Sequence, residues 1–279
     1  MDNSVALLDL TNLPWDSSLP THIIFDVDGT LTDQESRTSP QTFQALRDLT
    51  AAGIKIILAT GRTFGSSDIF LKKAQIPAKL VCAGGAVTWN NGKIAATYHP
   101  QSAVKTAVEY GKSHGITLLL ESVDTLLLDE DAPYIPPLLR TASEGMPIAR
   151  GDVYKAAEEK TVKVTFCGRK ELLDNCWEEI TERFPGTVRG HASFIDFPPV
   201  GISKWTGIQK ILQEEQLDPA EGLGVGDSGN DVPWIAHMGY PLAAPQATPD
   251  LLAVTKWQLP RSTHHIADFA AAILQHQKI

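Results

Sequence analysis

The feature that most limits how this chain can fold is a repeated order of segments: an apolar run, a polar turn, then a helix-period stretch. Apolar runs near the start of the chain cover residues 22–25, 54–60 and 79–83, and two more near the end cover 222–226 and 240–244. Strands that alternate with helices in this way are typical of a parallel sheet covered by helices. We therefore predict a doubly wound, Rossmann-like α/β core.

The first predicted helix has recognisable ends. Ser39 suits the N-cap because its hydroxyl can accept from the unpaired amides of the first turn, and Pro40 suits the first helical position. Gly53 suits the exit, where a left-handed backbone is common. Phe43, Leu46 and Leu49 lie at helical spacing and are expected to face the core.

The middle of the chain has a different order of predicted strands and helices. The pair Asn91-Gly92 favours a type I′ turn and so predicts a hairpin. Further strand pairs and at least two helices follow, which indicates an α+β insertion. The predicted organisation is an N-terminal extension (1–20), a core formed by both ends of the chain (21–86 and 200–279) and an inserted domain (87–199).

The bulk composition excludes several classes of function. The chain has 24 Lys and Arg against 33 Asp and Glu, a formal net charge of −9, whereas nucleic acids and anionic membranes demand clustered basic residues. No apolar run approaches the ~20 residues of a membrane helix. Three scattered cysteines, and an opening MDNSVALLDL without a basic segment, favour a reducing compartment. We expect a cytoplasmic monomer or homodimer with no nucleic-acid or membrane partner.

Two aspartates stand one residue apart at the end of the first predicted strand, in the stretch FDVDGTLTD. In a strand, residues two apart point to the same face, so Asp26 and Asp28 would lie side by side. Like charges ~4 Å apart repel by about 4 kcal/mol at the effective dielectric of a protein surface. Some other group must therefore neutralise the pair.

Polar residues also follow or begin three other core segments, at the edge where open α/β sheets build their sites. They are Thr60-Gly61-Arg62, Lys204, and the group Asp227, Asn230 and Asp231. If all of these meet with Asp26 and Asp28, the excess of carboxylates would suit Mg²⁺, which prefers oxygen ligands and often faces phosphate.

The same set of residues suits phosphoryl transfer. Lys204 in the first turn of a helix opposes the helix dipole, at a cost of typically ~0.3–1 kcal/mol, and beside the acidic segments this favours a role as phosphate ligand. A carboxylate next to a bound phosphate can attack it to form an aspartyl-phosphate, while a second carboxylate serves as general acid and base.

These motifs resemble those of the haloacid dehalogenase-like (HAD) superfamily of phosphatases, and in particular its Cof-type subgroup IIB with a large α/β cap. DVDGTL is similar to the first family motif, ATGR to the second, DFPPVGISK to the third and GDSGNDVP to the fourth. The resemblance covers nearly everything from residue 21 onward. It implies that the insertion is a cap domain, which covers the site and selects the leaving group.

The resemblance also implies a role for each matching residue. Asp26 would be the phosphate-accepting nucleophile and a Mg²⁺ ligand, and Asp28 the acid and base, with its backbone carbonyl on the metal. The other implied roles are phosphoryl binding by Thr60 and Lys204, metal binding or support by Asp227 and Asp231, and substrate positioning by Gly61, Arg62 and Asn230. The implied function is a Mg²⁺-dependent phosphatase of a small phosphorylated metabolite, usually a sugar phosphate.

Three positions depart from the usual family pattern. Gly84-Gly85-Ala86 stands where relatives usually read Asn-Gly-Ala, which removes a side-chain contact at the core–cap junction. Trp205 replaces a glycine after the lysine, and Trp234 replaces an aliphatic residue or methionine. None of these changes touches the predicted chemistry, but all of them bear on the choice of substrate.

An oxidoreductase is the strongest hypothesis from another class. The stretch GVGDSG, residues 224–229, satisfies G-x-G-x-x-G after a strand, and Asp250 stands roughly where a ribose-binding acid is expected in nicotinamide-dependent enzymes. Against it, Asp227 would place a negative charge in the loop meant for pyrophosphate. The three prolines between residues 241 and 249 also interrupt the strand that should lead to Asp250.

Two further hypotheses share the phosphatase scaffold. A non-catalytic sugar-phosphate sensor is disfavoured because Asp26 and Asp28 are both present. A phosphomutase or phosphotransferase would use the same phosphoenzyme with an alcohol in place of water. The choice of acceptor depends on cap shape and water exclusion, which the residues alone do not determine.

Overall fold

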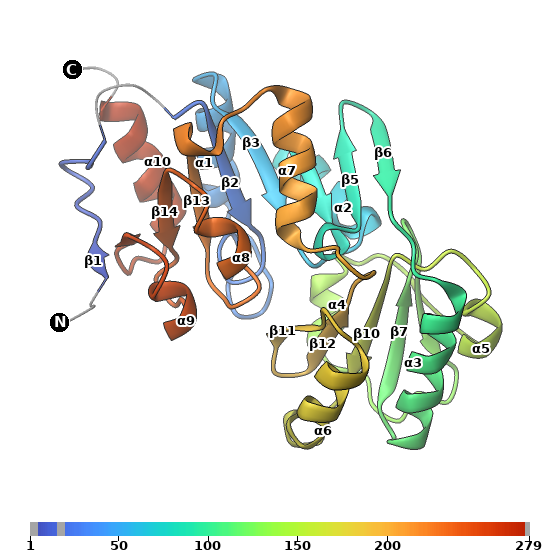
Figure 1. Cartoon of the computed structure of the whole chain (residues 1–279). Helices are drawn as coiled ribbons and strands as arrows, with labels where there is room; N and C mark the ends of the chain where they lie inside the picture. Colours follow the sequence, from blue (N-terminus) through green and yellow to red (C-terminus); the bar gives the residue numbers. More distant parts are fainter. Residues whose placement is uncertain (1–4, 16–19, 277–279) are drawn as a thin grey trace. The chain divides into compact units, whose positions relative to one another are not determined.

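The structure, a computed structural model, describes residues 5–15 and 20–276, which fold as two compact units (Figure 1). The first unit takes in Met1–Ala59, Phe70–Lys79 and Gln209–Ile279, and the second takes in Thr60–Ile69 and Leu80–Ile208. The predicted domain bounds stay a prediction. None of the helices in the described residues combines the length and the hydropathy that a bilayer crossing requires.

In the first unit, strands lie side by side in the order β1, β15, β14, β13, β2 and β3, and each neighbouring pair is parallel. Their bounds are Ala6–Leu7 (β1), Trp257–Gln258 (β15), Tyr240–Ala243 (β14), Gly222–Gly226 (β13), His22–Asp26 (β2) and Lys55–Ala59 (β3). β2 and β13 are buried along their whole length, which fits the apolar residues between His22 and Asp26 in β2 and the apolar sequence of β13. The predicted parallel α/β core is confirmed.

Helix α1 (Pro40–Ala51) has the predicted ends. The Ser39 hydroxyl accepts from the Thr42 amide at 3.0 Å, and Gly53, directly after the helix, has a φ of +88°. α1 packs against α10 at the other end of the chain. The remaining helices of the unit are α8 (Val232–Ile235), α9 (Pro249–Leu252), α10 (His265–His276) and the 3₁₀ turn η2 (Pro219–Glu221), while α2 (Phe64–Ala74) and α7 (Lys204–Glu215) are divided between the units.

The described part of the N-terminal segment lies along the edge of this sheet. β1 pairs with β15, and Trp15 is buried with only 7% of its surface exposed. The Trp15 ring lies 5.2 Å from that of Tyr240 and 6.4 Å from that of Trp257. The segment therefore contributes both backbone pairing and aromatic packing to the first unit.

His22, at the start of β2, is fully buried, and this makes the stability of the fold depend on pH. Its Nδ1 lies 2.9 Å from the Thr21 hydroxyl. Burial, assisted by the positive charge of Lys55 and opposed by Asp218, lowers the pKa of His22 to about 4. The neutral ring is therefore the form that the fold accommodates.

We expect acid to destabilise the protein through His22. The unfolded state binds a proton near pH 6.5 and the folded state only near pH 4, so stability is lost as the pH falls between these values. The loss at pH 4 should reach about 3 kcal/mol. Denaturant unfolding at pH 7 and pH 4 measures it. His22→Asn should show a smaller loss than wild type, and an equal loss in both proteins would contradict the assignment.

The second unit contains a six-stranded sheet in the order β11, β12, β10, β7, β8 and β9. All neighbouring pairs are antiparallel except β8 and β9, which are parallel. The bounds are Val188–His191 (β11), Phe194–Phe197 (β12), Lys163–Cys167 (β10), Thr117–Glu121 (β7), Leu126–Asp129 (β8) and Ile148–Gly151 (β9). The helices of this unit are α3 (Gln101–Ser113), α4 (Leu138–Ala142), α5 (Val153–Ala156) and α6 (Lys170–Arg183).

The second unit also holds the predicted hairpin. β5 (Val87–Asn90) and β6 (Lys93–Ala96) are antiparallel, and β5 pairs with β4 (Lys79–Cys82). Asn91 and Gly92 both have positive φ, +49° and +84°, as a type I′ turn requires. A 3₁₀ turn, η1 (Ala83–Gly85), connects β4 to β5.

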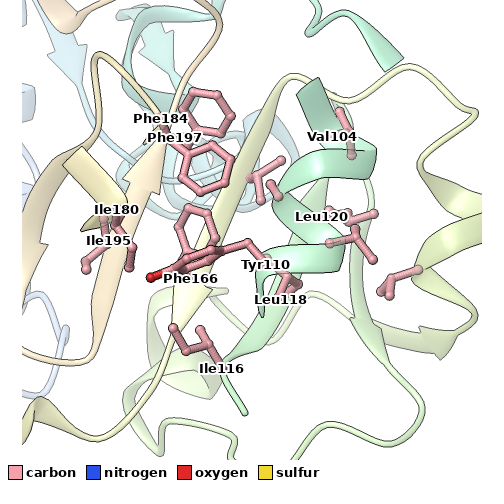
Figure 2. Packing of buried hydrophobic residues seen from close by; sticks show 14 of the residues in the cluster. Val104, Tyr110, Ile116, Leu118, Leu120, Phe166, Ile180, Phe184, Ile195 and Phe197 are labelled. Carbon is pink, nitrogen blue, oxygen red and sulfur yellow. The ribbon is translucent and has the colours of Figure 1, made fainter. Parts of the chain in front are cut away.

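One face of the six-stranded sheet is covered by α3 and α6 through an aromatic cluster (Figure 2). Tyr110, Phe166, Phe184 and Phe197 follow one another with ring centroids 5.2 to 6.1 Å apart. Side chains of a strand alternate between faces, so the strand residues next to Phe166 and Phe197 point to the opposite face of the sheet. The opposite face carries Leu119 and other apolar residues and, at one end of the strands, a group of charged ones.

The three cysteines, Cys82, Cys167 and Cys176, are buried and unbridged. Burial raises the pKa of the Cys82 thiol to about 12 and holds that of Cys167 well above its ordinary value. Because the thiolate is the reactive form, both side chains behave as small apolar groups near neutral pH.

Candidate active site

Three carboxylates gather at one edge of the parallel sheet in the first unit. One oxygen each from Asp26, Asp227 and Asp231 lie within 4.8 Å of one another. Asp26 ends β2 and Asp227 directly follows β13, and these two strands are parallel neighbours, with Phe25 opposite Val225 (Figure 1). Parallel pairing of strands from opposite ends of the chain therefore places the first and fourth motifs together.

The carboxylate cluster fits a hard divalent cation. Asp26 and Asp231 are buried, with 3% and 0% of their surfaces exposed. Three negative charges so close together repel one another strongly where water is scarce. An all-oxygen donor set of this kind is what Mg²⁺ prefers, and Mg²⁺ commonly keeps positions for water and phosphate oxygens. The residues present therefore fit the expected ion.

Gly29 explains why glycine follows the two aspartates in the first motif. It has a φ of +82°, and a methyl group at its Cβ position would lie 2.2 Å from Oδ2 of Asp227. The turn is closed by the amides of Leu31 and Thr32, which donate to the carbonyl of Val27 at 2.9 and 3.1 Å. The backbone of the first motif thus passes directly against the carboxylate of the fourth.

Asp231 organises the loop that carries Asp227. Its Oδ2 accepts from the amides of Asp227 and Ser228 at 3.1 and 3.3 Å, and its Oδ1 accepts from the indole Nε1 of Trp234 at 2.9 Å. Trp234 is fully buried, and this role was not predicted from the sequence. The signal was present in the spacing, because residues three apart at the start of a helix can face each other.

Asp28 lies outside the carboxylate cluster of the described residues. β2 ends at Asp26, so Asp28 falls in the following turn and the strand-face argument does not apply to it. Its Oδ1 accepts from the hydroxyl of Ser36 at 2.9 Å. Ser36 has a φ of +57° and was not among the site residues predicted from the sequence.

The second-motif residues and Lys204 belong to the second unit and surround the end of β4. Thr60 donates its amide to Val81 at 2.8 Å and accepts through its carbonyl from Gly84 at 3.2 Å. A Cβ on Gly85 would lie 1.9 Å from the Ser203 carbonyl oxygen and 3.1 Å from the backbone nitrogen of Lys204. The turn at Gly84-Gly85 therefore brings the Thr60 loop and the start of α7 together.

The remaining predicted substrate residues have clear partners. The buried Arg62 guanidinium forms an ion pair of 2.6 Å with Glu144 in the turn after α4. Asn230 accepts through Oδ1 from the Ser228 hydroxyl at 3.1 Å.

The oxidoreductase hypothesis receives mixed support from the geometry. The objection that proline breaks the strand is wrong for Pro241, because β14 runs through it and its carbonyl accepts from the Lys256 amide. However, Asp250 lies in the first turn of α9 and packs against Gly229, rather than ending a strand. Asp227 joins a carboxylate cluster, which would repel a pyrophosphate.

Comparison with known proteins gives a family. A family model described as haloacid dehalogenase-like hydrolase matches residues 23–267. A Streptococcus pyogenes protein provisionally named a phosphatase is 22% identical over 247 residues, which cover 84% of this chain and 91% of that protein. A phosphoglycolate phosphatase of Methanoculleus marisnigri is 24% identical over 247 residues, which cover 84% of this chain and 88% of the relative.

Solved structures share the fold. A HAD subclass IIB sugar phosphatase matches with a TM-score of 0.72 at 22% identity, covering 86% of this chain and 93% of its own. A structure from Plasmodium vivax, provisionally described as a HAD/COF-like hydrolase, matches with a TM-score of 0.82 at 18% identity, covering 92% and 97%. At these identities the likeness establishes the fold alone.

Proposed function

This chain belongs to the haloacid dehalogenase-like hydrolase family, and from that premise we propose that it is a Mg²⁺-dependent phosphatase of a small phosphorylated metabolite. The observation that carries the proposal is the cluster of Asp26, Asp227 and Asp231 at the sheet edge. Phosphatase names among the relatives support the reaction class, and a sugar phosphatase among the similar structures favours a sugar phosphate as substrate.

Asp26 and Asp28 divide the chemistry in this proposal. A carboxylate oxygen of Asp26 attacks phosphorus, the bond to the leaving oxygen breaks, and Asp28 donates its proton to that oxygen. Water then attacks the aspartyl-phosphate, Asp28 takes its proton, and phosphate leaves with Asp26 restored as a carboxylate. The hydrogen bond from Ser36 to Asp28 holds this acid and base in place.

Mg²⁺ would be held by Asp26 and Asp227, with Asp231 supporting the loop and the backbone carbonyl of Asp28 as a further ligand. When bound, the ion supplies positive charge that offsets the phosphoryl oxygens. It would also relieve the repulsion among the three carboxylates. The parallel pairing of β2 and β13 in the first unit, which brings the three carboxylates together from opposite ends of the chain, supports this assignment.

The proposed phosphoryl ligands are Thr60 and Lys204. Both are buried, with 1% and 4% of their surfaces exposed, and Lys204 begins α7. A lysine in the first turn of a helix is disfavoured by the helix dipole, and a bound phosphoryl anion would offset that cost. Gly61, Arg62 and Asn230 would position the substrate.

The proposal is tested by phosphate release from a panel of phosphorylated metabolites, with Mg²⁺ present or with excess EDTA. We expect release from one or more sugar phosphates with Mg²⁺ and none with EDTA. Activity that survives EDTA would contradict the metal assignment. A wild-type protein that releases no phosphate from any compound, including p-nitrophenyl phosphate, would contradict the function itself. Product analysis with added sugar acceptors separates hydrolysis from transfer.

Asp227→Ala should weaken the dependence on metal specifically. Because the substitution removes one carboxylate from the cluster, the Mg²⁺ concentration for half-maximal activity should rise by about tenfold or more. Titration of activity with Mg²⁺ measures the shift. Asp268→Ala, on the exposed face of α10, serves as the matched control and should titrate like wild type. An unchanged titration for Asp227→Ala would remove it from the metal site.

A further inference from the structure

A buried cluster of charged residues lies on the face of the six-stranded sheet opposite the aromatic cluster. Lys163 stands opposite Glu121 in the register of β10 and β7, and Thr165 stands opposite Asp196 in that of β10 and β12. The Lys163 Nζ lies 3.0 Å from Oε1 of Glu121 and 3.1 Å from Oδ1 of Asp196. Lys163 and Glu121 are only 4% and 3% exposed.

The third partner of Lys163 is a backbone carbonyl of the second motif. Its Nζ donates to the backbone carbonyl of Gly61 at 2.6 Å. An ammonium group has three N–H donors, and these three acceptors match them. Burial lowers the pKa of Lys163, but the charges of Asp196 and Glu121 outweigh it and raise the pKa above its ordinary value. Lys163 therefore remains a cation in this buried position.

The peptide bond between Gly61 and Arg62 links this cation to Thr60. The Gly61 carbonyl and the Arg62 amide belong to one planar unit, so holding the oxygen also fixes the N–H on the opposite side. That N–H donates to Oγ1 of Thr60 at 3.1 Å. With its oxygen occupied as an acceptor, the Thr60 hydroxyl is left to donate its own hydrogen elsewhere. A cation on the carbonyl also polarises the peptide and strengthens its N–H donor.

From this chain of contacts we propose that Lys163 is a positioning residue, which fixes the Gly61–Arg62 peptide and so aims the Thr60 hydroxyl at the phosphoryl group. The inference rests on the proposed function of Thr60 as a phosphoryl ligand. Arg62 reinforces the arrangement through its ion pair with Glu144, and the Gly65 amide donates to the Val123 carbonyl at 3.3 Å. The six-stranded sheet and its connections thus contact the second motif at Gly61 and Arg62, and the segment after it at Gly65.

The test is a double-mutant cycle between Lys163→Met and Thr60→Ala. If Lys163 acts through Thr60, Lys163→Met alone should lower kcat/KM by about tenfold to a hundredfold. In the Thr60→Ala background the same change should cost less than about threefold, because the hydroxyl to be aimed is gone. The loss should be equal for p-nitrophenyl phosphate and for a sugar phosphate. Additive losses, or a loss that depends on the leaving group, would overturn the proposal.

Two further variants separate positioning from folding. Lys163→Met leaves Glu121 and Asp196 without their cation, so Lys163→Met combined with Glu121→Gln provides a version with less uncompensated charge. It should show the same coupling to Thr60. Lys105→Met, which removes an exposed ion pair with Glu158 in the same unit, should leave kcat/KM unchanged. A loss in Lys105→Met equal to that in Lys163→Met would indicate a general effect and overturn the proposal.

Hydrogen exchange decides the inference even if the proposed function fails. Exchange in a peptide covering residues 60–65 should be faster in Lys163→Met than in wild type, and unchanged in Lys105→Met. Unchanged exchange in Lys163→Met would overturn the proposed hold on the Gly61–Arg62 peptide. An inactive wild type would refute the phosphatase function, while this measurement would still report on Lys163.

Discussion

Asp26→Asn is expected to abolish phosphate release, with a loss in kcat of at least about 10³-fold for every substrate that the wild type accepts. An amide has almost the size and shape of a carboxylate but is not a competent nucleophile toward phosphorus. Asp26 ends a fully buried strand. Because asparagine fills the same space as aspartate there, the substitution should leave the fold intact. Steady-state phosphate release at saturating Mg²⁺ provides the measurement.

Stability distinguishes this loss from misfolding. Asp26→Asn removes one of the three clustered charges, so the metal-free variant should unfold at a temperature no lower than that of metal-free wild type. Mg²⁺ should raise the melting temperature of wild type more than that of the variant. Asp48→Asn, on α1, is the matched control and should keep full activity. Substantial turnover by Asp26→Asn would exclude the aspartyl-phosphate route.

Gly29→Ala should cause the second large effect, on both stability and activity. The added methyl would lie 2.2 Å from Oδ2 of Asp227, so the turn or the carboxylate must move. Left-handed strain alone costs roughly 1–2 kcal/mol for alanine, and overpacking typically adds about 1–3 kcal/mol. A displacement of about 1 Å at a metal ligand should lower kcat/KM by about a hundredfold. Thermal unfolding and Mg²⁺-dependent phosphate release measure the two effects.

Gly53→Ala separates strain from collision. Gly53 has a φ of +88°, nearly that of Gly29, but no atom lies within 4 Å of its Cβ position among the described residues. It should therefore lose only the strain contribution to stability and keep wild-type activity. If the two variants lost the same stability and both stayed active, the close approach of Gly29 to Asp227 would not be required for stability or activity.

Local signals in the sequence predicted much of the fold. Ser39 and Pro40 mark the start of α1, and Asn91-Gly92 marks the hairpin, because capping and turn formation depend on residues within a few positions of each other. The apolar runs predicted the parallel strands because a strand buried on both faces is apolar along a short continuous stretch of sequence. Pro241 is the exception: it suggested a weakened strand, but β14 includes it between β13 and β15.

The candidate site was predictable only where a motif carried it. Asp26, Asp227 and Asp231 were identified from short motifs, and the parallel pairing of β2 and β13 brings them together. The hydrogen bond from Trp234 to Asp231 was not predicted because a tryptophan three residues after an aspartate can have several structural roles, and the spacing alone does not distinguish them. Lys163 was missed because its partners Glu121 and Asp196 come from neighbouring strands, and their register is not readable from composition or spacing.

The burial of all three cysteines has a practical consequence. Maleimides and spin-label reagents attack exposed thiolates, and the native side chains offer poor targets in the folded state. A single cysteine introduced on an exposed helix face of either unit would therefore take up the reagent selectively. Paired labels, one in each unit, could then follow their separation through the catalytic cycle without first removing any native thiol.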